Sequence, residues 1–303
     1  MNDTIFFSGT SNPVLAAFVA QDLGLVTGKI EITRFIDNEC RVYVKEDVRG
    51  KNVFILQSLS QIADQHLVEL CLIGQAVKDL GASSATAVIP WMGYSKQDKA
   101  FRSGEAVSAQ LVAKFIEAAG FDRVITIELH SEKLTPFFTI GVTELSTHNL
   151  LASSLRKEIE IESAVVVSPD KGGQSRSERF ANKLGLSVVY LRKVRDLTTG
   201  RIRIADASES VEGKRVIIFD DIINTGETAI RSSEYLASIG AKNIHFLATH
   251  AVLAGEAGTL LQRSPIDMII VTDTIQLPKD KTFPKLRVVT VAPFLAEEIR
   301  RSI

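Results

Sequence analysis

The sequence contains little cysteine, and this scarcity narrows what the chain can be. Only two cysteines, Cys40 and Cys71, occur in 303 residues. Two thiols cannot crosslink a chain of this length, and they show no metal-ligand spacing, so neither a disulfide framework nor a cysteine-based metal site is expected. Free thiols are typical of proteins in a reducing compartment, and we therefore expect a cytoplasmic protein.

Long apolar segments and an excess of either charge are also missing. No apolar run approaches the roughly 18 residues of a membrane-spanning helix. The start, MNDTIFFSGTSNP, lacks the basic segment and long apolar stretch of a signal peptide. The 35 basic and 36 acidic residues give a net charge of −1. We expect no membrane partner and no nucleic-acid partner, and any anion must be bound by a local site.

What the sequence does contain is an alternation of apolar, β-rich runs with amphipathic segments. The length suggests two domains. Amphipathic stretches at 66–81 and 229–240 have a helical pattern. The alternation indicates βαβ units, parallel sheets and the α/β fold class. The β-rich runs lie at 51–58, 84–90, 123–129, 164–169, 186–191, 214–221, 243–250 and 267–273.

The two halves of the chain also resemble each other. Three matches in the same order at nearly one spacing indicate two similar α/β domains. We expect the first domain at 1–148 and the second at 149–292, and a helix over 293–303 is a candidate to pack back on the first. The matches are DLGL at 22–25 with KLGL at 183–186, GKNVFIL at 50–56 with GKRVIIF at 213–219, and LGASSATAVIP at 80–90 with IGAKNIHFLATH at 239–250.

The stretch VIIFDDIINTGET, residues 216–228, places two adjacent acids at the expected end of a strand. Asp220 and Asp221 are followed by a glycine loop that leads into a helix. Free backbone N–H groups at a helix start form an anion site, and Thr225 and Thr228 add donors. Acids beside a phosphate site suit a ribose phosphate, whose hydroxyls they bind directly or through a metal. The alternative is a strand-end acid pair followed by an ordinary Asn or Thr helix cap.

Two further expected strand ends carry polar residues. The loop in VVVSPDKGGQSR, residues 165–176, presents an acid, two cations, a hydroxyl and bare glycines, which together form a polyphosphate cradle without Walker A spacing. Its polar and glycine residues are Asp170, Lys171, Gly172, Gly173, Ser175 and Arg176. VITIELH delivers His130, either a metal ligand or hydrogen-bond donor, or an ordinary strand-end histidine.

Two stretches are rich in charge and poor in regular pattern. Residues 93–108 contain Lys96 and Lys99, and residues 191–204 place Lys193 and Arg195 two apart after a strand. We expect irregular loops in both places. Such runs are either solvated surface or mobile cationic loops that neutralise phosphate charge over a cleft.

Together these motifs resemble the ribose-phosphate pyrophosphokinase family, over nearly the whole chain. Ordinary phosphoribosyltransferases share the phosphoribosyl loop, but they are usually single-domain proteins without the YSKQDK segment. The resemblance implies two similar domains of phosphoribosyltransferase type. The motifs that carry it are TRFIDNE, DVRGKNVFILQS, IPWMGYSKQDKAFRSGE, IELH, VVVSPDKGG, DDIINTGET, THAVLAGEA and VTDTIQLP.

The resemblance implies transfer of the β,γ-pyrophosphoryl group of MgATP to ribose 5-phosphate, with release of AMP, for nucleotide biosynthesis. The FxDxE loop of the family holds adenine in a neighbouring subunit, which implies a homo-oligomer with a shared ATP site. The positions that match the family's ATP-binding residues are Phe35, Asp37, Glu39, Lys96, Gln97, Lys99 and His130.

Most of the remaining matches to the family lie in the second half of the chain. His130 and Asp170 match its magnesium ligands, and Lys193 and Arg195 match its catalytic basic pair, which stabilises the in-line transition state. The pyrophosphate loop is implied at Asp170, Lys171, Gly172 and Gly173. The ribose 5-phosphate site is implied at Arg195, Asp220, Asp221, Asn224, Thr225, Gly226, Glu227 and Thr228.

Three positions depart from the family pattern. Asn224 stands where the family often has Asp, Glu227 where it often has Gly, and Glu128 where Asp is usual. Since a carboxylate facing a phosphate would repel it, we expect Glu227 to point to solvent from the first turn of its helix.

Two alternatives remain beside an active synthetase. The departures motivate a non-catalytic regulatory paralogue that co-assembles with an active enzyme, although a non-catalytic subunit has no physical need for both the basic pair and the metal ligands. A phosphoribosyltransferase that consumes the same sugar phosphate would explain the 216–228 stretch, but it leaves the first 150 or so residues without a role.

Overall fold

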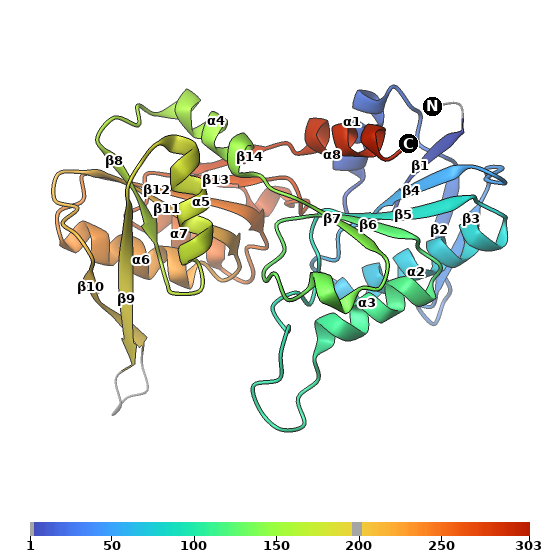
Figure 1. The fold of residues 1–303 in the computed structure, drawn as a ribbon, viewed down its shortest axis with the longest axis horizontal. Coiled ribbons are helices and arrows are strands. Elements are labelled where there is room, and N and C mark those ends of the chain that lie inside the picture. The colour runs from blue at the N-terminus through green and yellow to red at the C-terminus, as the bar shows by residue number, and fades with distance from the viewer. Residues whose placement is uncertain (1–2, 196–201) are drawn as a thin grey trace. The chain divides into compact units, whose positions relative to one another are not determined.

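The computed structural model (Figure 1) describes residues 3–195 and 202–303. The chain divides into two units. The first comprises Met1–Ser146, Thr274–Gln276 and Thr290–Ile303, and the second comprises Thr147–Asp273 and Leu277–Val289. The boundary expected after residue 148 lies close to the structural boundary after Ser146.

The first unit is built on a parallel sheet in the order β1-β4-β5-β6-β7. Helices α2 and α3 lie on one side of this sheet, and α1 and α8 lie together on the other (Figure 1). The strands and helices are β1 (Thr4–Ser8), α1 (Pro13–Leu23), β2 (Ile30–Arg34), β3 (Cys40–Val44), β4 (Asn52–Leu56), α2 (Ala63–Asp79), β5 (Ser84–Ile89), α3 (Ser108–Ala118), β6 (Arg123–Ile127), η1 (Thr135–Phe137), β7 (Gly141–Leu145) and α8 (Ala292–Arg301). Strands β2 and β3 form a separate antiparallel hairpin.

The second unit has a larger sheet in the order β10-β9-β8-β11-β12-β13-β14, parallel except for the edge strand β10. Neighbouring residues of β11 face opposite cores: Phe219 packs with α4 and α5, whereas Ile218 packs with α6 and α7. The elements are α4 (His148–Glu158), β8 (Ala164–Ser168), α5 (Gln174–Leu184), β9 (Val188–Arg195), β10 (Ile202–Ala207), β11 (Arg215–Ile223), α6 (Glu227–Ser238), β12 (Asn243–Ala251), α7 (Ala257–Arg263), β13 (Met268–Thr272), η2 (Lys279–Lys281) and β14 (Leu286–Val289).

The internal repeat found in the sequence is a repeat of topology. The order β1-β4-β5-β6-β7 of the first sheet recurs as β8-β11-β12-β13-β14 in the second. Helices α1 and α5 both end at a left-handed glycine, Gly24 with φ 69° and Gly185 with φ 72°, a conformation that costs glycine little. The prediction of two similar α/β domains is confirmed.

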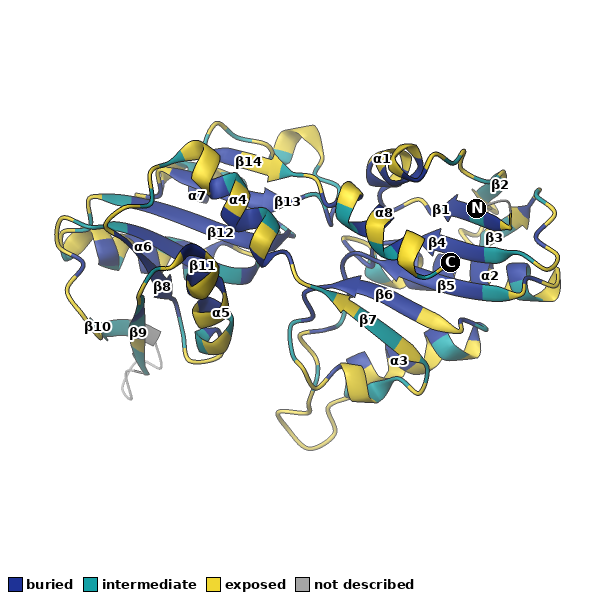
Figure 2. Cartoon of the chain, turned by 45° about the horizontal axis from the view of Figure 1, so that its top comes forward, coloured by how far each residue is buried: buried dark blue, intermediate teal, exposed yellow. Residues whose placement is uncertain are grey.

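Burial on both faces explains why the central strands read as continuous apolar runs (Figure 2). The pattern of β8, AVVVS, is buried at every position, and so is that of β13, MIIVT. Exposed positions concentrate on the outer sides of the helices (Figure 2). Among the described residues, no helix is both long and apolar enough to cross a membrane.

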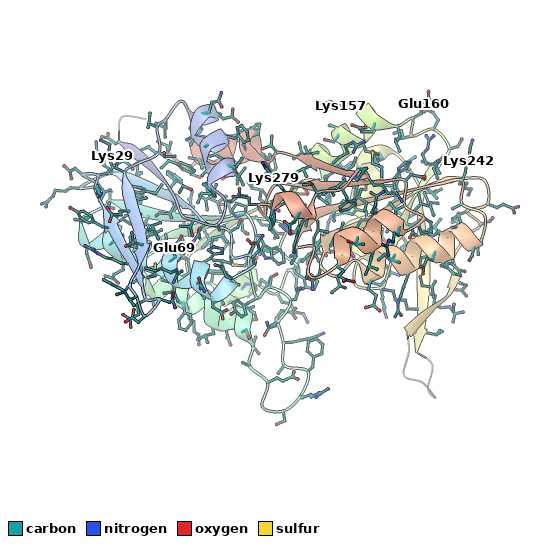
Figure 3. All side chains as sticks on the ribbon, turned by 180° about the vertical axis from the view of Figure 1, so that it is seen from behind. Lys29, Glu69, Lys157, Glu160, Lys242 and Lys279 are labelled. Carbon is teal, nitrogen blue, oxygen red and sulfur yellow. The ribbon has the colours of Figure 1, made fainter. Side chains whose placement is uncertain are left out.

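A buried carboxylate organises the loop after β1. Glu69 of α2, 1% exposed, accepts hydrogen bonds from the Thr10 backbone N–H at 2.7 Å and from Gln57 Nε2 at 2.6 Å (Figure 3). A side chain at Gly9 would lie 2.3 Å from Gln57 Oε1. A glycine is therefore required where the backbone at position 9 approaches the Gln57 side chain. The loop at the carboxyl end of β1 is ordered by hydrogen bonds to the buried Glu69 carboxylate.

Two expectations about strand ends need correction. Strand β11 continues past Asp220 and Asp221 to Ile223, since β12 offers backbone partners as far as Ala251. The basic segment 191–204 is not irregular throughout: β9 extends to Arg195 and pairs with β10, while residues 196–201 lie outside the described residues.

The imidazole of His245 on β12 gives the second unit a dependence on pH. It is 5% exposed, and neither ring nitrogen has a hydrogen-bond partner among the described residues. Burial lowers the pKa of His245, Arg215 lowers it further, and Asp267 opposes both. The unfolded chain takes up this proton near pH 6.5 and the folded chain only at lower pH, so the free energy of unfolding decreases as the pH falls below about 6.5.

We therefore expect His245→Leu to lose less thermal stability than the wild type on acidification. The measurement is the melting temperature of both proteins at about pH 7.5 and about pH 5.5. Equal decreases in the two proteins would contradict the assignment.

Candidate active site

The loop after β8 is organised around the carboxylate of Asp170. Its Oδ1 accepts a hydrogen bond from the Gly173 backbone N–H at 3.0 Å, and its carbonyl accepts one from Ser168 Oγ at 3.0 Å. A side chain at Gly172 would lie 3.4 Å from Asp170 Oδ1. The loop turns back on its own acid and leaves Lys171 and Gly172 exposed. Bare backbone next to a cation suits an anionic ligand.

Strand β9 brings Lys193 to the same loop. Because β8 and β9 are parallel neighbours, their carboxyl ends share one edge of the sheet. Lys193 Nζ lies 3.3 Å from Asp170 Oδ2, with 29% of the lysine side chain and 40% of the aspartate side chain exposed. An ion pair this open to water contributes little to stability. The contact brings a predicted catalytic cation and a predicted metal ligand together.

A cavity of about 490 Å³ adjoins this contact. Arg195 ends β9 opposite Ile202 of β10, and the Arg195 side chain lies outside the described part of the structure. Of the predicted basic pair, Lys193 is the residue whose side-chain contact, with Asp170, the structure describes. The cavity is lined by Lys171, Gln174, Tyr190, Leu191, Arg192, Lys193, Asp206 and Ser208.

One guanidinium joins the two acids of β11. Arg176 Nη1 lies 2.9 Å from Asp221 Oδ1 and 3.2 Å from Asp220 Oδ1. Asp220 Oδ1 also accepts a hydrogen bond from the Asp221 backbone N–H at 2.9 Å. Burial and then the charge of Asp221 raise the pKa of Asp220 well above its usual range, and Arg176 opposes the rise. The acid pair is a local concentration of negative charge, and Arg176 is a cation that contacts both acids.

The loop 224–228 connects β11 to α6. Its backbone is held by the loop after β12, where the Leu253 N–H donates to the Ile223 carbonyl at 3.2 Å and the Ala254 N–H to the Asn224 carbonyl at 2.8 Å. Helix α6 begins after Gly226, whose φ is 80°, and no side chain among the described residues caps its first turn. The alternative of an ordinary Asn or Thr cap is therefore wrong, and the N–H groups of this turn suit an anion.

Glu227 lies in the first turn of α6 and points away from the loop. Its side chain is 64% exposed, and its carboxylate lies 2.5 Å from Arg231 Nη2, one helical turn away. The expectation that this carboxylate faces solvent agrees with the structure. An acid in this place favours the helix dipole.

The candidates of the first unit occupy exposed positions. Phe35, Asp37 and Glu39 lie at the tip of the β2–β3 hairpin, where the Phe35 side chain is 53% exposed. The tip is ordered by its own backbone: the Phe35 N–H donates to the Glu39 carbonyl at 3.0 Å, and Asp37 Oδ1 accepts from the Glu39 N–H at 3.2 Å. An ordered, exposed aromatic is suited to contact with another molecule.

The segment between β5 and α3 carries Lys96, Gln97 and Lys99, all exposed. Gln97 Oε1 accepts a hydrogen bond from Ser108 Oγ at 2.7 Å, which ties the segment to the start of α3. Lys99 Nζ lies 4.9 Å from the centre of the Phe101 ring. His130 is half-buried, after the end of β6.

The donor set for a metal is small. Among the residues the structure describes, no three His, Cys, Asp or Glu side chains cluster as metal ligands. Asp170 belongs to the second unit and His130 to the first. The partly exposed Asp170 carboxylate suits a hard cation that keeps most of its waters, such as Mg²⁺, rather than a fully liganded zinc site.

The sequence predicts Arg176 as one of the cations of a polyphosphate cradle, and this expectation needs correction, because the structure places its guanidinium against Asp220 and Asp221. Its partners lie on β11, more than forty positions away, and only the fold brings them together. The sequence shows a cation three residues after a Gly-Gly turn, but it does not show that this cation pairs with the acids of β11.

Comparison with known proteins first defines the class. Residues 145–278 match the phosphoribosyl transferase domain, and residues 4–120 match the N-terminal domain of ribose phosphate pyrophosphokinase. The acid pair and the glycine loop that follows it both lie within the matched phosphoribosyl transferase domain.

Relatives over the full length then define the family. The chain is 39% identical to ribose-phosphate pyrophosphokinase of Aquifex aeolicus, covering 99% of this chain and 96% of that protein. It is 38% identical to the protein of that name from Caldanaerobacter subterraneus, covering 99% and 95%. The crystal structure of phosphoribosylpyrophosphate synthetase from Mycobacterium smegmatis matches with 34% identity and a TM-score of 0.93, covering 99% and 98%. The chain belongs to the ribose-phosphate pyrophosphokinase family and is an enzyme, a transferase of kinase type in nucleotide biosynthesis.

Proposed function

We propose that this enzyme transfers the β,γ-pyrophosphoryl group of MgATP to the C1 hydroxyl of ribose 5-phosphate, giving phosphoribosyl pyrophosphate and AMP. A bond forms between the C1 oxygen and the β-phosphorus, and the bond from the β-phosphorus to the α,β-bridging oxygen breaks. The observation that carries the proposal is the contact of Lys193 with Asp170 at the sheet edge that also presents the 224–228 loop. The names of the full-length relatives support it.

The sugar phosphate is held by β11 and the loop that follows. The first-turn N–H groups of α6, with Thr225 and Thr228, bind the 5-phosphate. The acid pair accepts hydrogen bonds from the ribose hydroxyls. Asn224 keeps its carbonyl bonded to the Ala254 N–H, so the loop backbone is preorganised before substrate arrives.

The transferred group is held by the 170–173 loop and by β9. Exposed Lys171 and the bare backbone of Gly172 bind phosphate oxygens, and Gly173 orders the loop through its N–H bond to Asp170. Lys193 and Arg195 neutralise charge that grows in the in-line transition state. Asp170 and His130 are the residues that would serve as Mg²⁺ ligands, and the metal would supply charge neutralisation on the polyphosphate.

The nucleotide is bound by residues of the first unit. Lys96, Gln97, Lys99 and His130 contact ATP, and Phe35, Asp37 and Glu39 contact the adenine bound in a neighbouring subunit. Exposure of the ordered hairpin tip supports a homo-oligomer with a shared ATP site, because Phe35 is 53% exposed in the single chain. The two cysteines are free, which is typical of the cytoplasm we propose as its location.

Nucleotide analysis tests the proposed reaction. The protein is incubated with ATP, Mg²⁺ and ribose 5-phosphate, and the nucleotides are separated by chromatography. AMP that forms only when the sugar phosphate is present is the expected result. ADP would indicate ordinary kinase chemistry. Absence of turnover, with stimulation of an active family member on mixing, would favour the regulatory paralogue.

Replacement of Glu227 tests the phosphate loop. Because its carboxylate faces solvent and Arg231, we expect Glu227→Gly to change the KM for ribose 5-phosphate by less than about threefold. The variant should melt at a slightly lower temperature, since glycine is a poor helix former and the favourable helix-dipole interaction is lost. A KM that falls tenfold or more would show that the carboxylate opposes substrate, and would favour the regulatory paralogue.

A further inference from the structure

The first turn of α5 contacts the 170–173 loop and strand β11. The Gly173 N–H donates to Asp170 Oδ1 at 3.0 Å, and the Ser177 N–H donates to the Gly173 carbonyl at 2.9 Å. Ser177 Oγ donates to the Phe219 carbonyl at 3.3 Å, directly before the acid pair. Arg176 lies in this same turn. The turn therefore links the 170–173 loop to the end of β11.

The two acids of β11 differ in their surroundings. The Asp221 side chain is 2% exposed and that of Asp220 is 16% exposed. Asp220 makes its contacts through Oδ1, and Oδ2 accepts no hydrogen bond from the described residues. Asp220 thus retains an acceptor for a ligand, whereas Asp221 is enclosed by protein.

Arg176 is a cation that stabilises the two neighbouring carboxylates of Asp220 and Asp221. Its side chain is 12% exposed and reaches both carboxylates with one nitrogen. Two adjacent carboxylates with little access to water repel each other, and without a cation one of them would take up a proton or turn toward solvent. Either change would alter the charge or the arrangement of the acid pair to which Asp220 belongs.

We propose that Arg176 is a positioning residue for ribose binding, which holds Asp221 in a buried ion pair and fixes Asp220 as the carboxylate that receives the ribose hydroxyls. This inference rests on the proposed function. It gives the two acids different roles: Asp220 binds substrate, and Asp221 is the buried partner that orients Arg176. Arg176 itself does not contact the sugar.

The first test replaces the cation by an uncharged side chain of similar length. Arg176→Met is expected to raise the KM for ribose 5-phosphate by at least about tenfold and to leave the KM for ATP within about twofold. Lys183→Met, an exposed cation on the same helix, is the matched control and should leave both constants unchanged. Equal increases in both KM values, or no increase for the sugar, would overturn the proposal.

A double variant tests whether Arg176 and Asp221 act as a unit. Arg176→Met/Asp221→Asn is expected to have a KM for ribose 5-phosphate no higher than Arg176→Met alone, because both replacements disrupt the same ion pair. If the increases in KM from the two replacements multiply in the double variant, Asp221 binds substrate itself, and the proposed separate roles of Asp220 and Asp221 are wrong. If Arg176→Met does not melt cooperatively, Arg176→Lys takes its place. It keeps the charge but not the planar fork, and its expected KM increase is about threefold or more.

A binding measurement separates this inference from the proposed function. Ribose 5-phosphate should raise the melting temperature of the wild type and of Lys183→Met, and this shift should be lost in Arg176→Met, while the shift given by MgATP remains. No shift with the sugar phosphate in the wild type would count against the proposed function itself. A wild-type shift that Arg176→Met retains would overturn only the positioning role.

Discussion

Lys193→Ala is expected to lower kcat by about 10²-fold or more and to change the KM of either substrate by less than about threefold. The ammonium neutralises charge that develops only as the pyrophosphoryl group is transferred, so its removal raises the barrier without weakening ground-state binding. In the free protein the same group lies 3.3 Å from Asp170 Oδ2 in a half-exposed ion pair. Substrate phosphates can therefore take over the lysine at small cost.

The matched control for Lys193 is its neighbour on the same strand. Arg192 pairs with Asp206 of β10 through an exposed contact at 2.5 Å, with 65% of the arginine side chain exposed. Arg192→Ala should change kcat by less than about threefold, since exposed ion pairs contribute little. Steady-state kinetics of both variants check the prediction. If Lys193→Ala raises the KM and leaves kcat unchanged, the lysine acts in ground-state binding. If its kinetics equal those of the wild type, the lysine is a solvated surface residue without a role in the reaction.

Asp170→Asn is expected to raise the Mg²⁺ concentration needed for half-maximal rate by at least about tenfold. An amide keeps the hydrogen bond from the Gly173 N–H but loses the charge that attracts the cation. His130→Ala should change the Mg²⁺ requirement in the same direction. Because both residues follow strand ends outside the cores, neither variant should shift the melting temperature by more than about 3 °C.

The measurement is the rate as a function of free Mg²⁺ at fixed ATP and ribose 5-phosphate. Asp206→Asn provides the control, because this carboxylate lines the same cavity yet pairs with Arg192. Its Mg²⁺ requirement should equal that of the wild type. If both Asp170→Asn and His130→Ala kept the wild-type requirement, the two residues would not be the metal ligands.

The parts of the fold that the sequence could predict are those with local causes. Continuous apolar runs such as AVVVS and MIIVT predicted buried parallel strands. The match of DLGL with KLGL indicated two similar domains, and the structure shows that it marks equivalent helix ends at Gly24 and Gly185. The loop at 224–228 was also visible, because its glycine, its threonines and the helix that follows are neighbours in the sequence. The sequence left open whether an Asn or Thr side chain caps this helix.

The parts that the sequence could not predict depend on contacts between distant segments. The extension of β9 to Arg195 depends on pairing with β10, and that of β11 to Ile223 depends on β12. The ion pair of Arg176 with Asp221 requires α5 to pack beside β11. Neither the burial of Asp221 nor the pairing of Lys193 with Asp170 has a local signature, because both follow from which strands become neighbours.

The central claim is that a pyrophosphoryl group reaches C1 of ribose 5-phosphate, and labelled substrate tests it most directly. The protein is given ribose 5-phosphate labelled with ¹³C at C1, together with ATP and Mg²⁺, and the products are examined by ¹³C and ³¹P NMR. The proposed reaction predicts a C1 signal coupled to phosphorus, a diphosphate attached to that carbon, and AMP in equal amount. A single phosphate on C1 with formation of ADP, or an unchanged C1 signal beside intact ATP, would contradict it.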